Sequence, residues 1–450
     1  IATVLAGVFL ILMGLCHFGT LIKFIPYTIT TGFTSGIAVT IVIGQLKDFF
    51  GVTYPDGVKP IETMEKLEAF IGNINTVNTD ALIVGAVSLA ILIVSPYIFK
   101  KIPGSLIAVI VGILMVQFLP LKVSTIGNLY TISNALPSFH LPTVNFEIVQ
   151  AAIPNAFTIA ILAAIESLLS CVVADGMING KHRSDMELVA QGAGNIASAL
   201  FGGIPATGAI ARTAANIKNG GRTPVAGMVH SITLVIVLVV LMPYAGMIPM
   251  PTIAAILFIV AYNMCQWRTF LQLVKTAPKS DILVLVVTFV LTVLFDLVVA
   301  IEIGMILACL LFIKRMSEET KAESWVYTDD DTVAVNENLR KLPAEIRVYE
   351  VSGPLFFGAS DAIEHIVVEE SAKCLVLRMR AVPALDSTAM NALTALTKTC
   401  ESKGVTIVFS HVNEQPMKVM KKAGFVALAG EENFCPNITA ALERAEEIIK

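Results

Sequence analysis

One arginine lies within a stretch made mainly of glycine, alanine, threonine and proline, GGIPATGAIARTAANIKNGG at residues 202–221. The GGIP segment cannot continue a helix, but ATGAIARTAANI can begin one near Thr207. The first N–H groups of such a helix lack intrahelical partners and carry its positive dipole end, which suits an anion. Arg212, one turn further on, adds a full positive charge on a face shared with Gly208 and Asn216. Because small neighbours allow close approach of a ligand, we expect Thr207, Gly208, Ala209 and Arg212 to bind an anion.

A carboxylate, Glu166, lies inside the long apolar run PNAFTIAILAAIESLLSCVVAD at residues 154–175. On a helix it would lie about 16 Å from Asn155 along the axis, close to the middle of a bilayer. Asn155 and Ser170 fall within roughly 40° of it around the helix. Ionisable groups in membrane spans generally mark a pathway or a binding site, so Glu166 and Ser170 join the predicted site. The alternative is that Arg212 forms an ion pair with Glu166 or another carboxylate that has only a structural role.

These residues lie in a chain dominated by apolar segments. Of its 450 residues, 55% are hydrophobic and 15% are charged, whereas soluble domains are about a quarter charged. Eleven segments are long enough, or nearly so, to cross the ~30 Å hydrocarbon core; they are approximately 1–19, 28–46, 80–98, 103–120, 151–174, 188–202, 206–218, 223–243, 252–265, 281–295 and 297–313. The sequence therefore predicts a multi-span α-helical membrane domain over residues 1–315.

The distribution of Lys and Arg predicts the orientation of these segments. If the last span exits on the inner side at IKRMSEE, twelve basic residues fall in inner loops, among them Lys23, Lys100 and Lys101, and four fall in outer loops. Arg212 alone remains within the membrane. This topology places Ile1 at the outer face, so a cytoplasmic N-terminus would require an odd number of earlier spans. We expect the sequence to begin inside a membrane helix of a longer protein.

The pattern changes near residue 316, and residues 316–450 contain 21 of the 35 acidic residues. EIRVYEVSG, KCLVLRMRAV and GVTIVFSHV are typical of short buried strands, and helical patterns follow them in SDAIEHIVVEES, STAMNALTALTKTCES and QPMKVMKKAGF. The chain closes with an amphipathic helix, NITAALERAEEIIK. This alternation predicts a small α/β domain with a largely parallel sheet. DSTAMNAL at 386–393 is interpreted as a helix N-cap rather than a phosphorylation site.

Composition and spacing argue against several functions. The net charge of −4 does not favour a nucleic-acid partner. The seven cysteines are scattered without metal-ligand or disulfide spacing. Because no nucleophile–base pair or metal set appears, we expect neither an enzyme nor a bound cofactor.

The segments FIPYTITTGFTSGIAVTI, ESLLSCVVADGMINGKHRSDMELVAQGAGNIASALFGGIPATGAIARTAANIKNGGRTPVAGMVHS and IPMPTIAAILFIVAYNM closely resemble the SulP anion permeases. The C-terminal part resembles a STAS domain, the cytoplasmic module of these permeases. The resemblance implies fourteen membrane segments in two inverted repeats of seven, divided into a core and a gate domain. Eleven segments here and three missing ones make fourteen, so the chain would lack its first three spans.

The resemblance also assigns roles to individual residues. In the family the anion lies between the third and tenth segments, which are half-helices, beside the eighth. Residues 206–218 match the tenth segment and 151–174 the eighth, while the third is absent from this chain. Arg212 matches the basic position that faces the anion, and Glu166 matches the acid implicated in proton coupling.

The leading hypothesis is secondary active transport of an inorganic anion of the sulfate type, coupled to protons or exchanged for another anion, by an elevator-like movement of core against gate. A sodium–bicarbonate symporter is the next alternative, and a C4-dicarboxylate carrier is the third. In a different class, the membrane domain would chiefly anchor a regulatory STAS domain. We expect a homodimer in the inner (plasma) membrane of the cell, with the C-terminal domain in the cytoplasm and available to a regulatory protein.

Overall fold

The computed structural model describes residues 1–20, 25–55, 57–98, 102–131, 135–143, 145–295, 297–324, 342–343, 345–368 and 371–450. The chain forms two compact units, Ile1–Ala308 and Cys309–Lys450. Lys23, Lys100 and Lys101, which the topology assigns to inner loops, lie outside the described residues.

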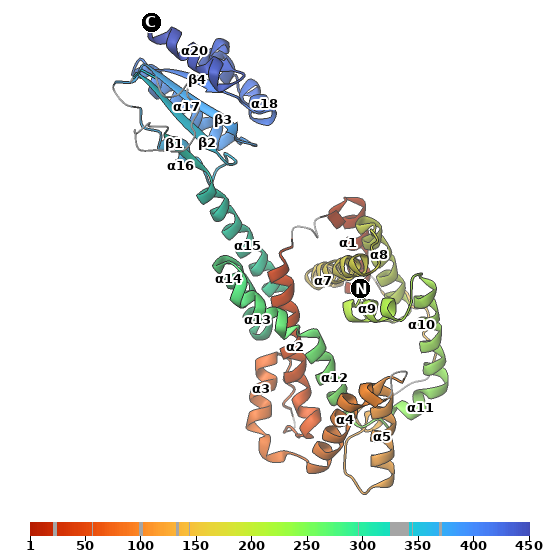
Figure 1. The fold of residues 1–450 in the computed structure, drawn as a ribbon. Coiled ribbons are helices and arrows are strands. Elements are labelled where there is room, and N and C mark those ends of the chain that lie inside the picture. Colours follow the sequence, from red (N-terminus) through yellow and green to blue (C-terminus); the bar gives the residue numbers. More distant parts are fainter. Residues whose placement is uncertain are drawn as a thin grey trace. The chain divides into compact units, whose positions relative to one another are not determined.

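The first unit is helical (Figure 1). Its elements are α1 (Ala2–Leu15), α2 (Tyr27–Phe50), α3 (Thr63–Gly72), η2 (Ile74–Thr76), α4 (Thr79–Ile98), α5 (Gly104–Phe118), α6 (Ile126–Leu129), α7 (Phe146–Ile178), α8 (Ser184–Leu200), α9 (Ile210–Lys218), α10 (Val225–Ile236), the π-helix η3 (Val237–Leu241), α11 (Met242–Ala245), α12 (Met250–Met264), α13 (Trp267–Thr276), α14 (Lys279–Leu294) and α15 (Leu297–Glu319), which continues into the second unit. A helix lies at each of the eleven predicted segments.

Five stretches of the described chain are long and apolar enough to cross a membrane, namely Tyr27–Phe50, Thr79–Ile98, Phe146–Ile178, Val225–Ala245 and Met250–Thr276. The last of these is divided into α12 and α13 by a turn. Two shorter helices, α1 and α5, are also apolar. The helical membrane fold is thus confirmed, while the number of crossings stays a prediction.

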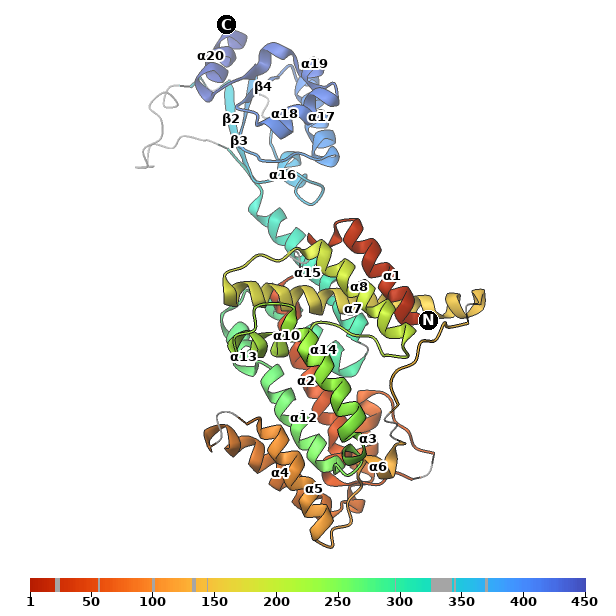
Figure 2. The ribbon, with the colours of Figure 1, turned by 90° about the vertical axis from the view of Figure 1, so that its right-hand side faces the viewer.

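Contacts sort most of these helices into two groups. In the first group, α7 packs against α1, α8 and α9, as Figure 1 shows. In the second group, α2 packs against α12 and α14, with α3, α4, α5 and α13 around them (Figure 2). The candidate anion-binding residues all belong to the first group.

Small residues allow the helices of each group to approach closely. A Cβ atom at Gly7 of α1 would lie 2.6 Å from the carbonyl oxygen of Gly192 in α8. In the second group, a Cβ at Gly32 of α2 would lie 2.6 Å from the Leu285 carbonyl oxygen of α14, and Gly36 meets Thr292 equally closely. Such close contacts at small residues are a common way for membrane helices to pack.

The second unit contains a five-stranded sheet in the order β1 (Lys321–Ser324), β2 (Ile346–Ser352), β3 (Cys374–Ala381), β4 (Thr406–Ser410) and β5 (Phe434–Cys435). β1 pairs antiparallel to β2, and the remaining pairs are parallel. Its helical elements are α16 (Asp361–Glu364), α17 (Ser387–Ser402), α18 (Glu414–Lys422), α19 (Phe425–Ala429), η5 (Glu431–Asn433) and α20 (Ile438–Ile449).

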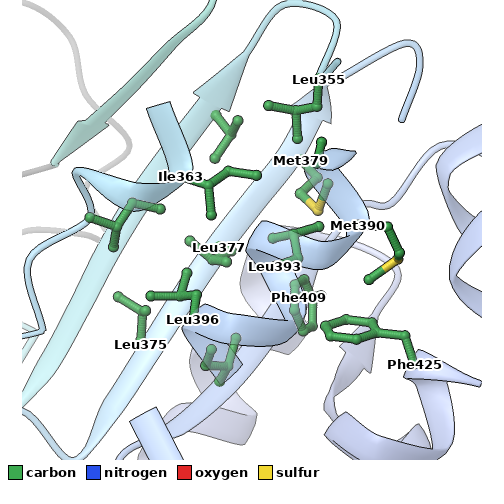
Figure 3. Packing of buried hydrophobic residues seen from close by; sticks show 14 of the residues in the cluster. Leu355, Ile363, Leu375, Leu377, Met379, Met390, Leu393, Leu396, Phe409 and Phe425 are labelled. Atoms are coloured by element: carbon green, nitrogen blue, oxygen red, sulfur yellow. The ribbon is translucent and has the colours of Figure 1, made fainter. Parts of the chain in front are cut away.

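Both faces of the sheet are covered, as parallel strands require. Leu375, Leu377 and Phe409 contribute to a core with α17, shown in Figure 3. Val376 and Val408 point to the opposite face and join a second cluster with Leu442 of α20. This alternation with a period of two confirms the predicted β3 and β4.

The predicted helix over SDAIEHIVVEES is largely wrong. Among its described residues, Asp361–Glu364 alone is helical, and those that follow are irregular. Ile366 and Val368 are buried whereas Val367 is exposed, which is the alternation typical of an extended segment. By contrast, α17 begins as expected, because Asp386 Oδ1 accepts a hydrogen bond from the Ala389 N–H at 2.9 Å.

Candidate functional site: a broken helix beside α7

An interruption between α8 and α9 forms the centre of the candidate site. α8 ends at Leu200 and α9 begins at Ile210, with Ala209 as its extended N-cap residue. The expected start near Thr207 is therefore wrong by three residues. Gly208 consequently lies before the helix rather than on one helical face with Arg212 and Asn216.

Asn195 of α8 fixes the first part of this interruption. Its side chain is buried, and its Oδ1 accepts a hydrogen bond from the Ala206 N–H at 2.9 Å. Its Nδ2 donates to the Ala206 carbonyl oxygen, also at 2.9 Å. The carboxamide thus satisfies both backbone groups of one residue, as a neighbouring strand would.

Ser167 of α7 fixes the second part. The Gly208 N–H donates to Ser167 Oγ at 3.0 Å, and Thr207 Oγ1 donates to the Ala163 carbonyl oxygen at 3.0 Å. Ser167 Oγ and Thr207 Oγ1 lie 3.1 Å apart. Since the one hydroxyl proton of Thr207 goes to Ala163, Ser167 must donate to Thr207. One chain of hydrogen bonds therefore holds residues 207 and 208 against α7, which explains the late start of α9.

The beginning of α9 is attached to the same helix. Ser170 Oγ donates to Thr213 Oγ1 at 2.8 Å, and Ser170 is buried. A Cβ at Gly208 would lie 3.2 Å from the Ser167 Cα, which is closer than most such contacts. Glycine therefore lets the backbone approach α7 closely enough for its N–H to reach Ser167.

Arg212 occupies the third position of α9 and is exposed. No carboxylate in the described part of the chain lies within 4.0 Å of its guanidinium, so the ion pair with Glu166 is not formed. A cation in the first turn opposes the helix dipole. An anion at this end would interact favourably with the guanidinium and with the first N–H groups of α9.

Glu166 lies next to Ser167 on α7 and is half-buried. It is about 40° from Ser170 around the helix, and therefore lies at the margin of the face that contacts α9. Asn155, predicted on the same side, is exposed about three turns away. The structure thus brings Thr207, Gly208 and Ser170 into contact with α7 or α9, and leaves the two charged residues without a direct ion pair.

Sequence reasoning missed three residues that form this site, Ser167, Asn195 and Thr213. Ser167 is displaced by about 100° from Glu166 on the helix, so it does not lie on the polar face that Glu166 shares with Ser170. Two hydroxyl residues at i and i+3, Ser167 and Ser170, together with Thr207 in the break and Thr213 after it were a usable signal. No cluster of His, Cys, Asp or Glu suited to a metal occurs among the residues that the structure describes.

Comparison with family models gives two matches. The model of the sulfate permease family matches residues 1–288, and the STAS domain model matches residues 340–441. Both the membrane unit and the sheet-containing unit therefore resemble known domains.

Curated relatives cover nearly the whole chain. The Bacillus subtilis protein named "Putative sulfate transporter YvdB" is 36% identical over 446 residues, covering 96% of this chain and 81% of the relative. The bicarbonate transporter BicA of Synechocystis is 32% identical, with 98% and 78% covered.

Two solved structures are similar to this one. The murine anion transporter Slc26a9 in its inward-facing state has a TM-score of 0.85 at 20% identity, over 99% of this chain and 75% of that chain. This likeness concerns the fold alone. The transmembrane domain of a cyanobacterial BicA has a TM-score of 0.56 at 29% identity, over 68% and 74% of the two chains.

Proposed function

This chain belongs to the sulfate permease family, and from that premise we propose that it is a secondary active transporter of an inorganic anion of the sulfate type. The matched families and relatives are transporters rather than enzymes. The anion would bind at the start of α9, and the group of α1, α7, α8 and α9 would move relative to the group of α2, α12 and α14.

The observation that carries this proposal is the uncompensated positive charge of Arg212 at the start of α9. The guanidinium and the helix N-terminus both favour an anion, and no described carboxylate neutralises them. Sulfate offers several acceptor oxygens, so it can receive hydrogen bonds from the fork of Arg212 and from backbone N–H groups together. Thr207, Gly208, Ala209 and Ser170 would shape the site, because hydrogen bonds to α7 or the start of α9 fix their positions.

Glu166 is the proposed coupling residue. It is half-buried beside the site, without an ion-pair partner in the described part of the chain. An anion that screens Arg212 would make it easier for Glu166 to take up a proton, which would link entry of the two ions. Exchange for a second anion would not require this residue to change its charge.

A sodium–bicarbonate symporter is the second candidate. The relative BicA of Synechocystis is named a bicarbonate transporter. Glu166 precedes Ser170 by one helical turn, and Ser170 Oγ lies 2.8 Å from Thr213 Oγ1. A carboxylate with adjacent hydroxyl oxygens offers the oxygen ligands that hard cations prefer, so Na⁺ could take the place of the proton in coupling.

Uptake by the purified full-length protein in proteoliposomes tests the proposal. We expect accumulation of labelled sulfate that excess bicarbonate, fumarate and chloride reduce only weakly. Strong competition by bicarbonate with a requirement for Na⁺ would select the symporter, and competition by fumarate would select the C4-dicarboxylate carrier. If none of these anions moves in labelled form, the transport proposal is wrong and the scaffold hypothesis remains.

We also propose the cellular arrangement. The chain would act as a homodimer in the inner (plasma) membrane of the cell, with residues 1–315 as the transport domain. Residues 316–450 would lie in the cytoplasm and offer a surface to a regulatory protein. The excess of Lys and Arg in the inner loops supports this orientation.

A further inference from the structure

Helix α13 (Trp267–Thr276) joins two helices of the membrane unit through sharp turns. Gln266, just before it, adopts the left-handed conformation with φ 44° and ψ 38°, so α12 does not continue into α13. Ala277, just after it, is extended, and α14 begins at Lys279. A ten-residue helix with a turn at each end does not prolong either neighbour, so α13 is a separate connecting helix between α12 and α14.

One side of α13 packs on the protein. Phe270 meets Phe289 of α14 edge to face, with ring centroids 5.3 Å apart, and α13 also contacts α2. An adjoining stripe of large apolar side chains is open. Trp267 is 43% exposed, Leu271 47% and Val274 37%. These residues, at i, i+4 and i+7, form one continuous helical face.

Basic residues border this apolar stripe. The Arg268 guanidinium lies over the Trp267 ring, 5.5 Å from its centroid. Lys275 occupies the last turn and is exposed, and Lys279 follows at the start of α14. The sequence of α13, WRTFLQLVKT, contains no acidic residue. An apolar stripe beside such a cationic border is typical of helices that lie in a membrane interface.

We propose that α13 binds anionic phospholipids of the cytoplasmic leaflet. The Trp267, Leu271 and Val274 side chains enter the boundary of the acyl chains, and Arg268 and Lys275 contact the headgroup phosphates. Each basic residue close to an anionic membrane surface raises the preference of the helix for anionic over neutral lipid about fivefold. Only the choice of leaflet rests on the proposed orientation of the chain. The attraction between the basic side chains and the headgroup phosphates does not depend on which leaflet they meet.

Helix α3 (Thr63–Gly72) provides a comparison within the same chain. It joins α2 to the α4 region as α13 joins α12 to α14, and it also contacts α2 and α14. The charged residues at and within α3 are mainly acidic: they are Glu62, Glu65 and Glu68, with Lys66 between them. The same physical argument therefore predicts that α3 has no preference for anionic lipid.

Trp267 is a direct reporter, because the chain has only two tryptophans, Trp267 and Trp325. In a Trp325→Phe background, the protein is placed in nanodiscs that contain both phosphatidylglycerol and phosphatidylcholine, with either one brominated on its acyl chains. We expect brominated phosphatidylglycerol to quench Trp267 fluorescence about twofold or more better than brominated phosphatidylcholine at equal mole fraction. In the double variant Arg268→Gln and Lys275→Gln, the two brominated lipids should quench Trp267 fluorescence equally. In Lys66→Gln, phosphatidylglycerol should remain the better quencher.

Three outcomes would overturn the proposal. Absence of quenching by either lipid would mean that a second copy or another protein covers the stripe. Equal quenching of the starting protein would mean that α13 touches lipid without selecting its charge. A preference that survives in the double variant would mean that other residues recognise the anionic lipid.

Discussion

The backbone N–H of Gly208 donates to Ser167 Oγ at 3.0 Å, across 41 residues of sequence. This bond joins the segment before α9 to the residue that follows Glu166 on α7. A change in the position of α9 would therefore act directly on the surroundings of the carboxylate. The bond gives a physical basis for coupling between a bound anion and Glu166.

The first prediction concerns the close approach at Gly208. Gly208→Ala should reduce anion affinity and destabilise the membrane unit by about 1–3 kcal/mol, because its Cβ would lie 3.2 Å from the Ser167 Cα. Thermal unfolding and ligand titration measure the two effects. Gly194→Ala in α8 is the control, since a Cβ there meets nothing within 4 Å and should be neutral or stabilising. Equal behaviour of the two variants would show that the contact at Gly208 is not needed.

The second prediction concerns coupling by Glu166. Glu166→Gln cannot take up or release a proton, so uptake should lose its dependence on external pH while anion binding persists. Proteoliposome uptake over a pH series, together with equilibrium binding, checks both parts. Glu147→Gln, at the exposed start of the same helix, should behave like the unaltered protein. If Glu166→Gln keeps the original pH response, another group carries the coupling ion.

Local patterns in the sequence were sufficient for the eleven apolar helices and for three strands, but they did not indicate β1 or β5, and they made the helix at α16 too long. Apolar length located a helix at each of the eleven segments, and alternation located β2, β3 and β4. The cap at Asp386 followed from its residue type and the apolar helix after it. These features depend on neighbours within a few residues, which the sequence displays directly.

The contacts that form the site join residues far apart in the sequence, so local patterns could not predict them. A helical wheel places Ser167 and Ser170 around α7, but it does not indicate which side meets α9. The hydrogen bonds of Asn195 to Ala206 likewise arise only after α8 and the following segment fold back on each other. For the same reason, the start of α9 shifted from Thr207 to Ile210, because bonds to α7 outweighed local helix propensity.

The third prediction concerns the independence of the C-terminal part. Residues 316–450, expressed alone, should give a soluble domain with mixed helix and sheet by circular dichroism. The sheet has apolar clusters on both faces, and Leu375 and Val376 are each almost completely buried within the unit. A cooperative thermal transition would support the boundary, whereas aggregated or unfolded material would contradict it.

The fourth prediction uses the buried thiols of that domain. Burial raises the pKa of Cys374 from 9.0 to about 12 and that of Cys400 to about 11. Unfolded thiols release protons from about pH 9 upward, while the folded domain retains them. The free energy of unfolding should therefore fall as pH rises from about 9 to 11.

Urea unfolding of residues 316–450 between pH 7 and pH 11 measures this slope. Cys400→Ala lowers stability through the lost buried sulfur, but it should reduce the decline above pH 9. Cys435→Ala is the matched control, because that residue is less buried than Cys400. An unchanged slope in Cys400→Ala would mean that other groups cause the alkaline loss of stability.

The binding of sulfate by Arg212→Ala tests the central claim most directly, using isothermal titration with the purified full-length protein. We expect at least about a tenfold loss of affinity, since a charged hydrogen bond contributes about 1.5–3 kcal/mol. Stability should change by less than about 0.5 kcal/mol, because the side chain is exposed. Lys218→Ala, at the other end of α9, should bind as before. Unchanged affinity in Arg212→Ala would contradict an anion site at the start of α9.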